Sequence, residues 1–159
     1  MNPMLVVTHV MTGAMLGLLL APEHAFFVFF LSFIMHFLID IIPHGDAKLY
    51  ATYLQGKKLF HARLYVAVDV LCSALLLAFI WMRPLDPSIH TLVLWGVAGG
   101  VFPDILVGLY EQFRFAPLAV FHRFHLFFHD VLTKRVGDVP FWFGVSAQAV
   151  LITGFFLFF

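Results

Sequence analysis

Five long apolar segments constrain the fold of this chain more than any other feature of its sequence. They cover residues 4–20, 25–42, 64–82, 89–109 and 140–159. An α-helix rises about 1.5 Å per residue, so about 20 apolar residues match a hydrocarbon core roughly 30 Å thick. The sequence therefore predicts an all-α integral membrane bundle of about five transmembrane helices, which form a single transmembrane domain over residues 1–159.

The composition agrees with a membrane protein and argues against a nucleic-acid partner. Hydrophobic residues make up 62% of the chain and charged residues 11%, with a mean hydropathy of +0.98. Nine basic and nine acidic residues give a net charge of zero. Without a long basic tract, the chain has no obvious surface for phosphate backbones. The expected surroundings are a lipid bilayer.

Residues 112–136 differ from the apolar segments, because phenylalanines alternate there with histidine and arginine. This mixture is typical of a helix that lies at the membrane interface. The basic residues give the orientation: eight of the nine flank two connections on one side, namely Lys48, Lys57, Lys58, Arg63, Arg114, Arg123, Lys134 and Arg135. By the positive-inside rule, that side and the N-terminus face the cytoplasm of a multi-pass membrane protein.

The end of the second apolar segment carries four potential metal ligands. His36 and Asp40 are four residues apart, so they share one helical face at membrane depth, where ionisable groups are costly. Pro43 disfavours helical geometry at the residue before it, so the chain should leave the helix before His44 and Asp46. We expect His36, Asp40 and His44 to bind metal, and Asp46 to carry a proton.

Two further ionisable residues lie in other apolar segments. His9 is followed at helical spacing by Gly13 and Gly17, a small-residue face that allows another helix to approach closely. His9 should therefore point into the bundle, as a metal ligand or as a hydrogen-bonding histidine. Asp69 stands in an apolar helix and needs a cation, a partner or a proton. We expect it to join the metal site rather than an ion pair.

The fourth apolar segment contains Gly99-Gly100-Val-Phe-Pro-Asp104. Pro103 removes a backbone donor, and the glycines allow close approach of another segment. This pattern predicts an interrupted helix, which at membrane depth is tolerated beside a polar cavity. Asp104 would then serve as a metal ligand or catalytic group.

A block of histidines follows in the interfacial segment. His122, His125 and His129 are spaced i, i+3 and i+7, so they share one face of a helix. His125 and His129 repeat the i, i+4 spacing of helical zinc sites, although the Glu of the protease signature is absent. We expect His125 and His129 as metal ligands and His122 as a proton carrier. The alternative is an interfacial helix whose histidines meet lipid headgroups.

Taken together, these motifs resemble those of the predicted bacterial membrane-bound metal-dependent hydrolases, which are small multi-helix proteins. The resemblance lies in Thr8-His9 with Gly13, in the stretch from His36 to His44, in Gly100-Val-Phe-Pro-Asp104 and in the block that starts at His122-Arg123. That block departs from the family's His-Arg-Gly and Thr-His pattern, because Phe124-His125 follow. Which late histidine binds metal therefore stays open.

These observations favour a hydrolase with one or two divalent ions. Imidazole with carboxylate suits Zn²⁺ or Mn²⁺ as well as Fe²⁺, whereas oxygen ligands alone would favour Mg²⁺ or Ca²⁺. A site at bilayer depth is most easily reached by an amphiphile, so the expected substrate is a lipid or lipid-linked (phospho)ester at the cytoplasmic leaflet. Lys58 and Arg123 are candidates for holding its headgroup.

Two other functions fit part of the pattern. Intramembrane Asp and His chains also build relays in metal-ion or proton transporters and channels. A transporter needs polar residues on both sides of the midplane, however, and the outer halves of these helices contain almost none. A non-catalytic membrane scaffold is the third alternative, and it predicts that Asp104→Asn leaves cellular function intact.

Overall fold

The structure, a computed structural model, describes residues 6–20, 24–43, 55, 59–137 and 139–158. Within these residues it contains six helices and no strand, which confirms the all-α class. The helices are α1 (Val6–Leu19), α2 (Ala25–Asp40), α4 (Leu59–Trp81), α5 (Pro87–Phe113), α6 (Leu118–Val136) and α7 (Phe141–Phe158). Each matches one of the six predicted segments.

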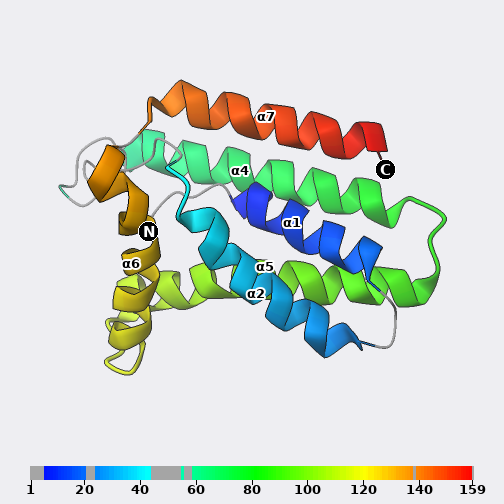
Figure 1. Ribbon diagram of the computed structural model, residues 1–159, viewed down its shortest axis with the longest axis horizontal. Helices are drawn as coiled ribbons and strands as arrows, with labels where there is room; N and C mark the ends of the chain where they lie inside the picture. Colours follow the sequence, from blue (N-terminus) through cyan, green and yellow to red (C-terminus); the bar gives the residue numbers. More distant parts are fainter. Residues whose placement is uncertain (1–5, 21–23, 44–54, 56–58, 138, 159) are drawn as a thin grey trace.

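Helix α5 is the element against which most of the others are arranged. It packs against α1 and α2 along much of its length and against α6 near its end, while α4 and α7 lie on the other side of α1 (Figure 1). The starts of α1, α4 and α7 lie at one end of the bundle, together with the ends of α2 and α5 (Figure 1). Helix α6 lies across this end. Residues far apart in the sequence therefore meet at that end.

Glycines set the close approach of α1 to α5. A methyl group added to Gly13 would overlap the carbonyl of Gly96, and one added to Gly17 would lie 2.5 Å from the Cα of Val93. On α5, a methyl group on Gly100 would lie 2.7 Å from the carbonyl oxygen of His9. The two backbones are in contact at three successive points, which confirms the predicted small-residue face.

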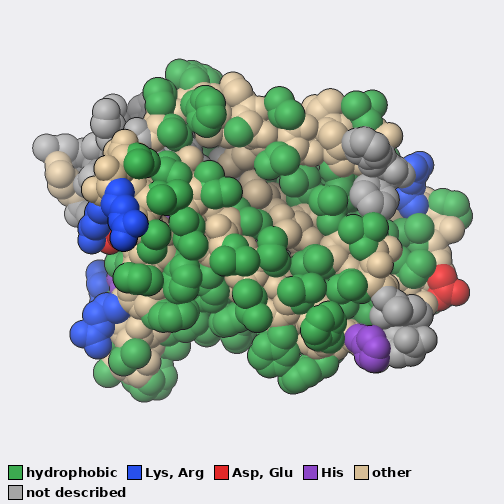
Figure 2. Space-filling model, in the orientation of Figure 1, with side chains coloured by type: hydrophobic (Ala, Val, Ile, Leu, Met, Phe, Trp, Pro, Cys, Tyr) green, Lys and Arg blue, Asp and Glu red, His purple; other side chains and the backbone are tan. Residues whose placement is uncertain are grey.

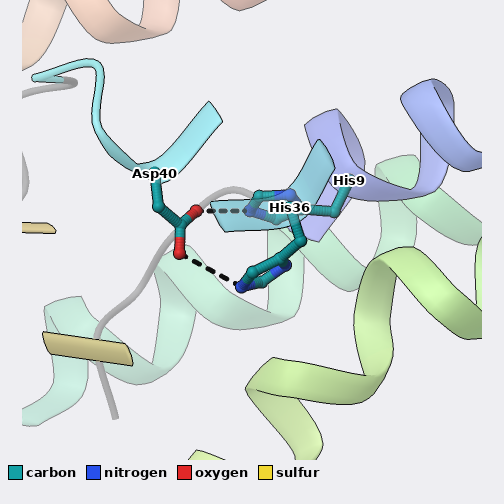
Figure 3. A group of neighbouring side chains, drawn as sticks. All are labelled: His9, His36 and Asp40. Atoms are coloured by element: carbon teal, nitrogen blue, oxygen red, sulfur yellow. Dashed lines mark ion pairs between the residues drawn. The ribbon is translucent and has the colours of Figure 1, made fainter. Parts of the chain in front are cut away.

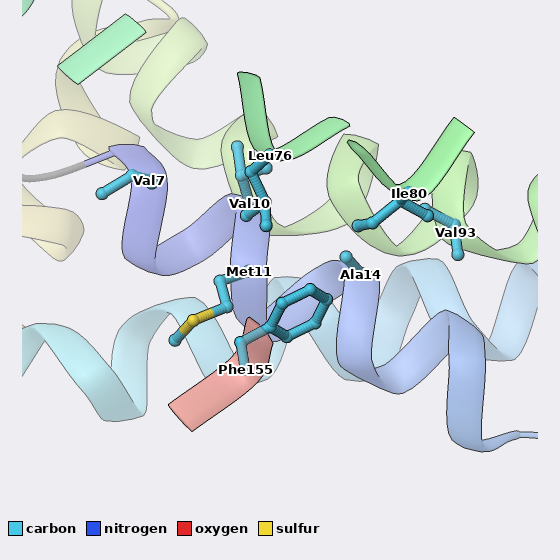
Figure 4. Packing of buried hydrophobic residues seen from close by; sticks show 8 residues of the cluster. All are labelled: Val7, Val10, Met11, Ala14, Leu76, Ile80, Val93 and Phe155. Atoms are coloured by element: carbon cyan, nitrogen blue, oxygen red, sulfur yellow. The ribbon is translucent and has the colours of Figure 1, made fainter. Parts of the chain in front are cut away.

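An apolar core fixes α1 between α4, α5 and α7. Its buried members come from all four helices: Val7, Val10, Met11, Ala14, Leu76, Ile80, Val93 and Phe155 (Figure 4). These side chains hold α1 on the sides that its glycines do not occupy. His9, which is 1% exposed, consequently points into the bundle, as its spacing from the glycines predicts.

Two described helices are long and apolar enough to cross a membrane, over Leu64–Trp81 and Pro87–Phe113. The apolar helices α1 and α2 and the apolar part of α7 are shorter, and the 14 residues of α1 reach only about 21 Å. Helix length therefore leaves the expected count of five spans open. On the face shown in Figure 2, hydrophobic side chains cover the middle, whereas the charged side chains lie near the two ends of the long axis. Such continuous apolar surface is unusual for a soluble monomer.

Helix α5 runs without a break from Pro87 to Phe113, so the predicted interruption at Gly99–Pro103 is wrong. Pro103 has no N–H and leaves the carbonyl of Gly99 without its usual donor, but the loss is limited to one bond. The packing of α1 and α2 on this part of α5 holds the helix together. Asp86 caps its start by accepting a hydrogen bond from the amide of Ser88 at 2.8 Å.

Candidate metal centre

The Asp40 carboxylate lies at the centre of a buried group of histidines. Its Oδ1 is 3.2 Å from Nε2 of His9 on α1, and its Oδ2 is 3.1 Å from Nε2 of His36 on α2 (Figure 3). His36 and Asp40 meet because they are one helical turn apart on the same face. The pair at the end of α2 is therefore brought together as its spacing predicts, with His9 beside it.

Helix α6 supplies two more histidines. Nε2 of His125 is 3.2 Å and Nε2 of His129 is 3.3 Å from Oδ2 of Asp40. The position of α6 is fixed by the Phe37 ring of α2, whose centroid lies 5.2 Å from that of Phe124 and 5.1 Å from that of Phe128. This aromatic contact turns one face of the His-rich helix toward Asp40. His125 is fully buried and His129 is 8% exposed.

Asp104 of α5 completes the cluster from a third side. Its Oδ1 lies 3.5 Å from Nε2 of His125 and 3.8 Å from Nε2 of His36. The Asp104 side chain is 18% exposed, whereas that of Asp40 is fully buried. Asp104 therefore marks the more accessible edge of the cluster, which we define as His9, His36, Asp40, Asp104, His125 and His129.

The backbone of α5 determines which nitrogen of His36 carries the proton. Nδ1 of His36 lies 2.7 Å from the carbonyl oxygen of Gly100, and a carbonyl can only accept, so Nδ1 must donate. In neutral His36, Nε2 is then a bare lone pair. That lone pair faces Oδ2 of Asp40 at 3.1 Å and Nε2 of His125 at 2.9 Å. Nε2 of His125 can donate to this lone pair when it carries the proton of that ring, but Oδ2 of Asp40 can only accept. The contact between His36 and Asp40 therefore needs a proton or a metal ion between the two atoms.

The charges and the spacing both fit a divalent ion. With neutral histidines, Asp40 and Asp104 leave two negative charges in a buried site, which one such ion would neutralise. Two ligands that are each about 2.1 Å from Zn²⁺ lie about 3.4 Å apart in tetrahedral geometry. The nitrogen to oxygen separations around Asp40 are 3.1 to 3.3 Å. These His and Asp groups could hold a metal ion.

Several buried polar atoms of the cluster lack a well-oriented hydrogen bond. Among the described residues, both carboxylate oxygens of Asp40 and both ring nitrogens of His9 have no such partner, although Nε2 of His9 is within ion-pair distance of Asp40. Leaving buried polar groups unpaired costs free energy. Coordination of a cation by these atoms would remove that cost.

Asp69, which we expected as a metal ligand, lies outside the cluster and instead contacts the start of α1. Its Oδ2 accepts a hydrogen bond from the amide of Val6 at 2.6 Å, and its Oδ1 accepts one from the amide of Val7 at 3.1 Å. The first amides of a helix have no acceptor within the helix, and the helix dipole there also favours a negative charge. Asp69 on α4 therefore caps α1, one turn before His9.

His122 and Arg123 also lie apart from the cluster. Nε2 of His122 is 3.7 Å from Oε1 of Glu111, and its ring lies over Tyr110 with 4.6 Å between centroids. Burial lowers the pKa of His122, and the neighbouring His125 lowers it further. Arg123 is exposed on the outer face of α6, away from Asp40. The contacts of His122 thus join it to Glu111 and Tyr110 rather than to Asp40.

Three of the expected site residues, His44, Asp46 and Lys58, lie outside the described residues. Three groups that matter were not anticipated: the Gly100 carbonyl, the Phe37 ring and Glu111. The sequence held a signal for one of them, because Gly100 is one turn before Asp104 on the face that the other helices approach. Comparison of the chain with protein-family models, curated proteins and solved structures found no match.

Proposed function

We propose that this protein is a membrane-embedded, metal-dependent hydrolase that cleaves a lipid or lipid-linked (phospho)ester at the cytoplasmic leaflet. The proposal includes about five membrane spans in the bacterial inner membrane, an N-terminus in the cytoplasm and the family suggested by the sequence motifs. The observation that carries it is the buried group of histidine nitrogens around the Asp40 carboxylate, in which Nδ1 of His36 is taken by the Gly100 carbonyl and its Nε2 lies 3.1 Å from Oδ2 of Asp40.

One or two Zn²⁺ or Mn²⁺ ions are the proposed cofactors. Asp40 supports the larger number, because its Oδ1 faces His9 while its Oδ2 faces His36, His125 and His129. A carboxylate used on both oxygens can bridge two ions. When bound, such an ion supplies Lewis acidity toward a phosphoryl or acyl oxygen and activates water.

The residues of the cluster divide into supporting and reactive groups. Gly100 holds the ring of His36, and Asp69 holds the helix end that carries His9. Asp104 lies at the edge of the site and its buried Oδ2 has no hydrogen-bond partner, so it is the carboxylate that we assign to take a proton from water. Its neighbours keep the rest of the cluster dry, because Asp40 and His125 are fully buried.

The position of the cluster favours hydrolysis over transport. Its residues come from the first turns of α1, the end of α2, the later part of α5 and α6. The start of α1 and the end of α2 lie at the end of the bundle that α6 covers (Figure 1). Among the described residues, the other buried polar side chains are Ser32, Asp69 and Ser73, and Asp69 is engaged in capping α1. A transporter needs a polar route on both sides of the membrane midplane. A one-sided site suits a substrate that is anchored in one leaflet.

Metal content tests the first part of the proposal. Wild-type protein purified in detergent is expected to contain about one or two Zn²⁺ or Mn²⁺ ions per chain, measured by mass spectrometry of the elements. Asp40→Asn should lose this metal. Asp86→Asn is the matched control, since Asp86 is exposed at the far end of the bundle. Wild-type protein that stays metal-free after incubation with either ion would sink the proposal.

Lipid analysis tests the second part. Cells with and without the protein are compared by lipid mass spectrometry, and the comparison is repeated with Asp104→Asn. A lipid ester that accumulates when the protein is absent and when Asp104 is replaced supports hydrolysis. Identical lipid profiles in all three strains, with metal present in the purified protein, would contradict the proposed hydrolysis. Only the proposed metal binding would then stand.

A further inference from the structure

A cavity of about 130 Å³ lies between α1, α2 and α7, next to the metal cluster. Most of its walls are apolar: Ile39 and Ile42 come from the end of α2, and Ala147 and Leu151 from α7. Thr8, His9 and Gln148 supply the few polar groups. The residues of α7 that line it are spaced along one face of that helix.

His9 belongs to the cavity and to the metal cluster at the same time. His9 is one of the residues that line the cavity, and its Nε2 lies 3.2 Å from Oδ1 of Asp40. The ring also stacks on that of His36 at 4.0 Å between centroids. A molecule in the cavity therefore has one end at the group that would hold the metal.

The apolar walls and the small volume of the cavity favour a hydrocarbon ligand. Apolar cavities exclude water, and an engineered cavity of about 150 Å³ in another protein binds benzene. A space of about 130 Å³ thus holds a short stretch of alkyl chain rather than a whole lipid. Its apolar lining would leave a sugar, a phosphate or a metal ion without partners.

The surface beside the cavity is also apolar. Ile42 is 60% exposed and Phe143 is 62% exposed, and both line the cavity. Ala147 is exposed as well. A chain could therefore enter sideways from the hydrocarbon region of a bilayer without crossing a polar surface. Water-soluble esters would not gain from this route.

Because the apolar lining of the cavity continues into the apolar surface beside it, we propose that the cavity between α1, α2 and α7 binds one hydrocarbon chain of the substrate, close to its ester linkage. The inference rests on the proposed function and narrows it: the substrate is a membrane lipid with a flexible alkyl or acyl chain next to the scissile bond. Lipids whose linkage is separated from the chain by a bulky polar group are poor substrates.

Photolabelling tests this without any hydrolysis. The purified protein is placed in phosphatidylcholine vesicles that contain phosphatidylglycerol with a diazirine near the carboxyl end of one acyl chain. Metal is removed with a chelator, and the labelled residues are mapped by mass spectrometry of peptides. Label is expected on the cavity residues of α7, Ala147 and Leu151, above the level on Ala149 and Val150, which do not line the cavity.

Two variants on α7 provide the comparison. Ala147→Phe fills the cavity and should lower the labelling of Leu151 about tenfold, whereas Ala149→Phe, with the same added bulk outside the cavity, should leave it unchanged. Ala147→Leu serves if the larger variant does not fold. Equal labelling of Leu151 in the 147 and 149 variants overturns the inference. So does a wild-type protein whose cavity residues are labelled no more than Ala149 and Val150, or one whose cavity residues cross-link to a second copy of the chain.

The two proposals fail separately. Selective labelling in a protein that binds metal and hydrolyses no lipid would contradict the hydrolase and leave the chain site standing. Lipid hydrolysis that depends on Asp104, with no selective labelling of the cavity, would contradict the chain site alone.

Discussion

His36 and Gly100 join α2 to α5 through a hydrogen bond of 2.7 Å, donated by Nδ1 of the ring to the backbone carbonyl. Gly100 lies in the turn of α5 before Pro103, and its lack of a side chain lets the backbone of α1 pass at His9. One residue therefore orients two histidines of the cluster. Metal-ligating histidines are commonly held in this way by a backbone carbonyl on their other nitrogen.

The late histidines can be distinguished by a matched pair of variants on α6. His125→Gln removes a ring that lies 3.2 Å from Asp40, so metal affinity should fall by at least about 100-fold. His122→Gln removes a ring that contacts Tyr110 and Glu111, so metal affinity should change by less than about threefold. Isothermal titration of chelator-treated protein with Zn²⁺ or Mn²⁺ measures both. Equal losses would mean that His122 is a ligand and that the present separation of the two rings is wrong.

The contact between α1 and α5 can be tested at its glycines. Gly13→Ala forces a methyl group into the carbonyl of Gly96, and overpacking of this kind costs about 1–3 kcal/mol of unfolding free energy. Gly108→Ala is the control on α5, because a methyl group there meets nothing within 4 Å and should stabilise the helix by up to about 1 kcal/mol. Urea or thermal unfolding in detergent gives the comparison. Equal stabilities of the two variants would contradict the packing described for α1.

Local sequence patterns predicted the cluster where all of the information lay within one helix. The i, i+4 spacing of His36 and Asp40, and of His125 and His129, determines which side chains share a face. It does not determine which helix lies opposite. Asp69 shows this limit: a carboxylate in an apolar helix needs a partner, but the start of α1 could not be recognised as that partner from the sequence of α4.

Pro103 shows a second limit. Proline in an isolated helix interior predicts a break, yet α5 continues through it because α1 and α2 pack closely on the same turns. The separation of His122 from His125 is a third case. A single helical face is about one hundred degrees wide, so residues at i and i+3 can reach different neighbours. Glu111, the neighbour of His122, lies on another helix.

Asp69→Asn separates the capping role from metal binding. The amide side chain keeps one acceptor oxygen but turns its NH₂ toward one of the two amides of Val6 and Val7, so part of the cap is lost. We expect unfolding free energy to fall by about 1 kcal/mol, the usual cost of a lost cap, while metal content stays at the wild-type level. Thermal unfolding and elemental analysis of the same sample measure the two effects. Loss of metal equal to that in Asp40→Asn would instead make Asp69 a ligand.

Metal removal should destabilise the wild-type protein through the junction of α1, α2, α5 and α6, which the cluster holds together. A ligand that binds only the folded state stabilises it by about 2.7 kcal/mol when its free concentration is 100 times its Kd. Chelation should therefore lower the Tm of the wild type, and added Zn²⁺ or Mn²⁺ should restore it. Asp40→Asn should have the same Tm with and without chelator, because the carboxylate charge and one of the two acceptor oxygens are lost. Thermal unfolding in detergent at fixed pH checks this. If the wild type and Asp40→Asn respond equally to chelation, the metal that matters for stability is bound elsewhere.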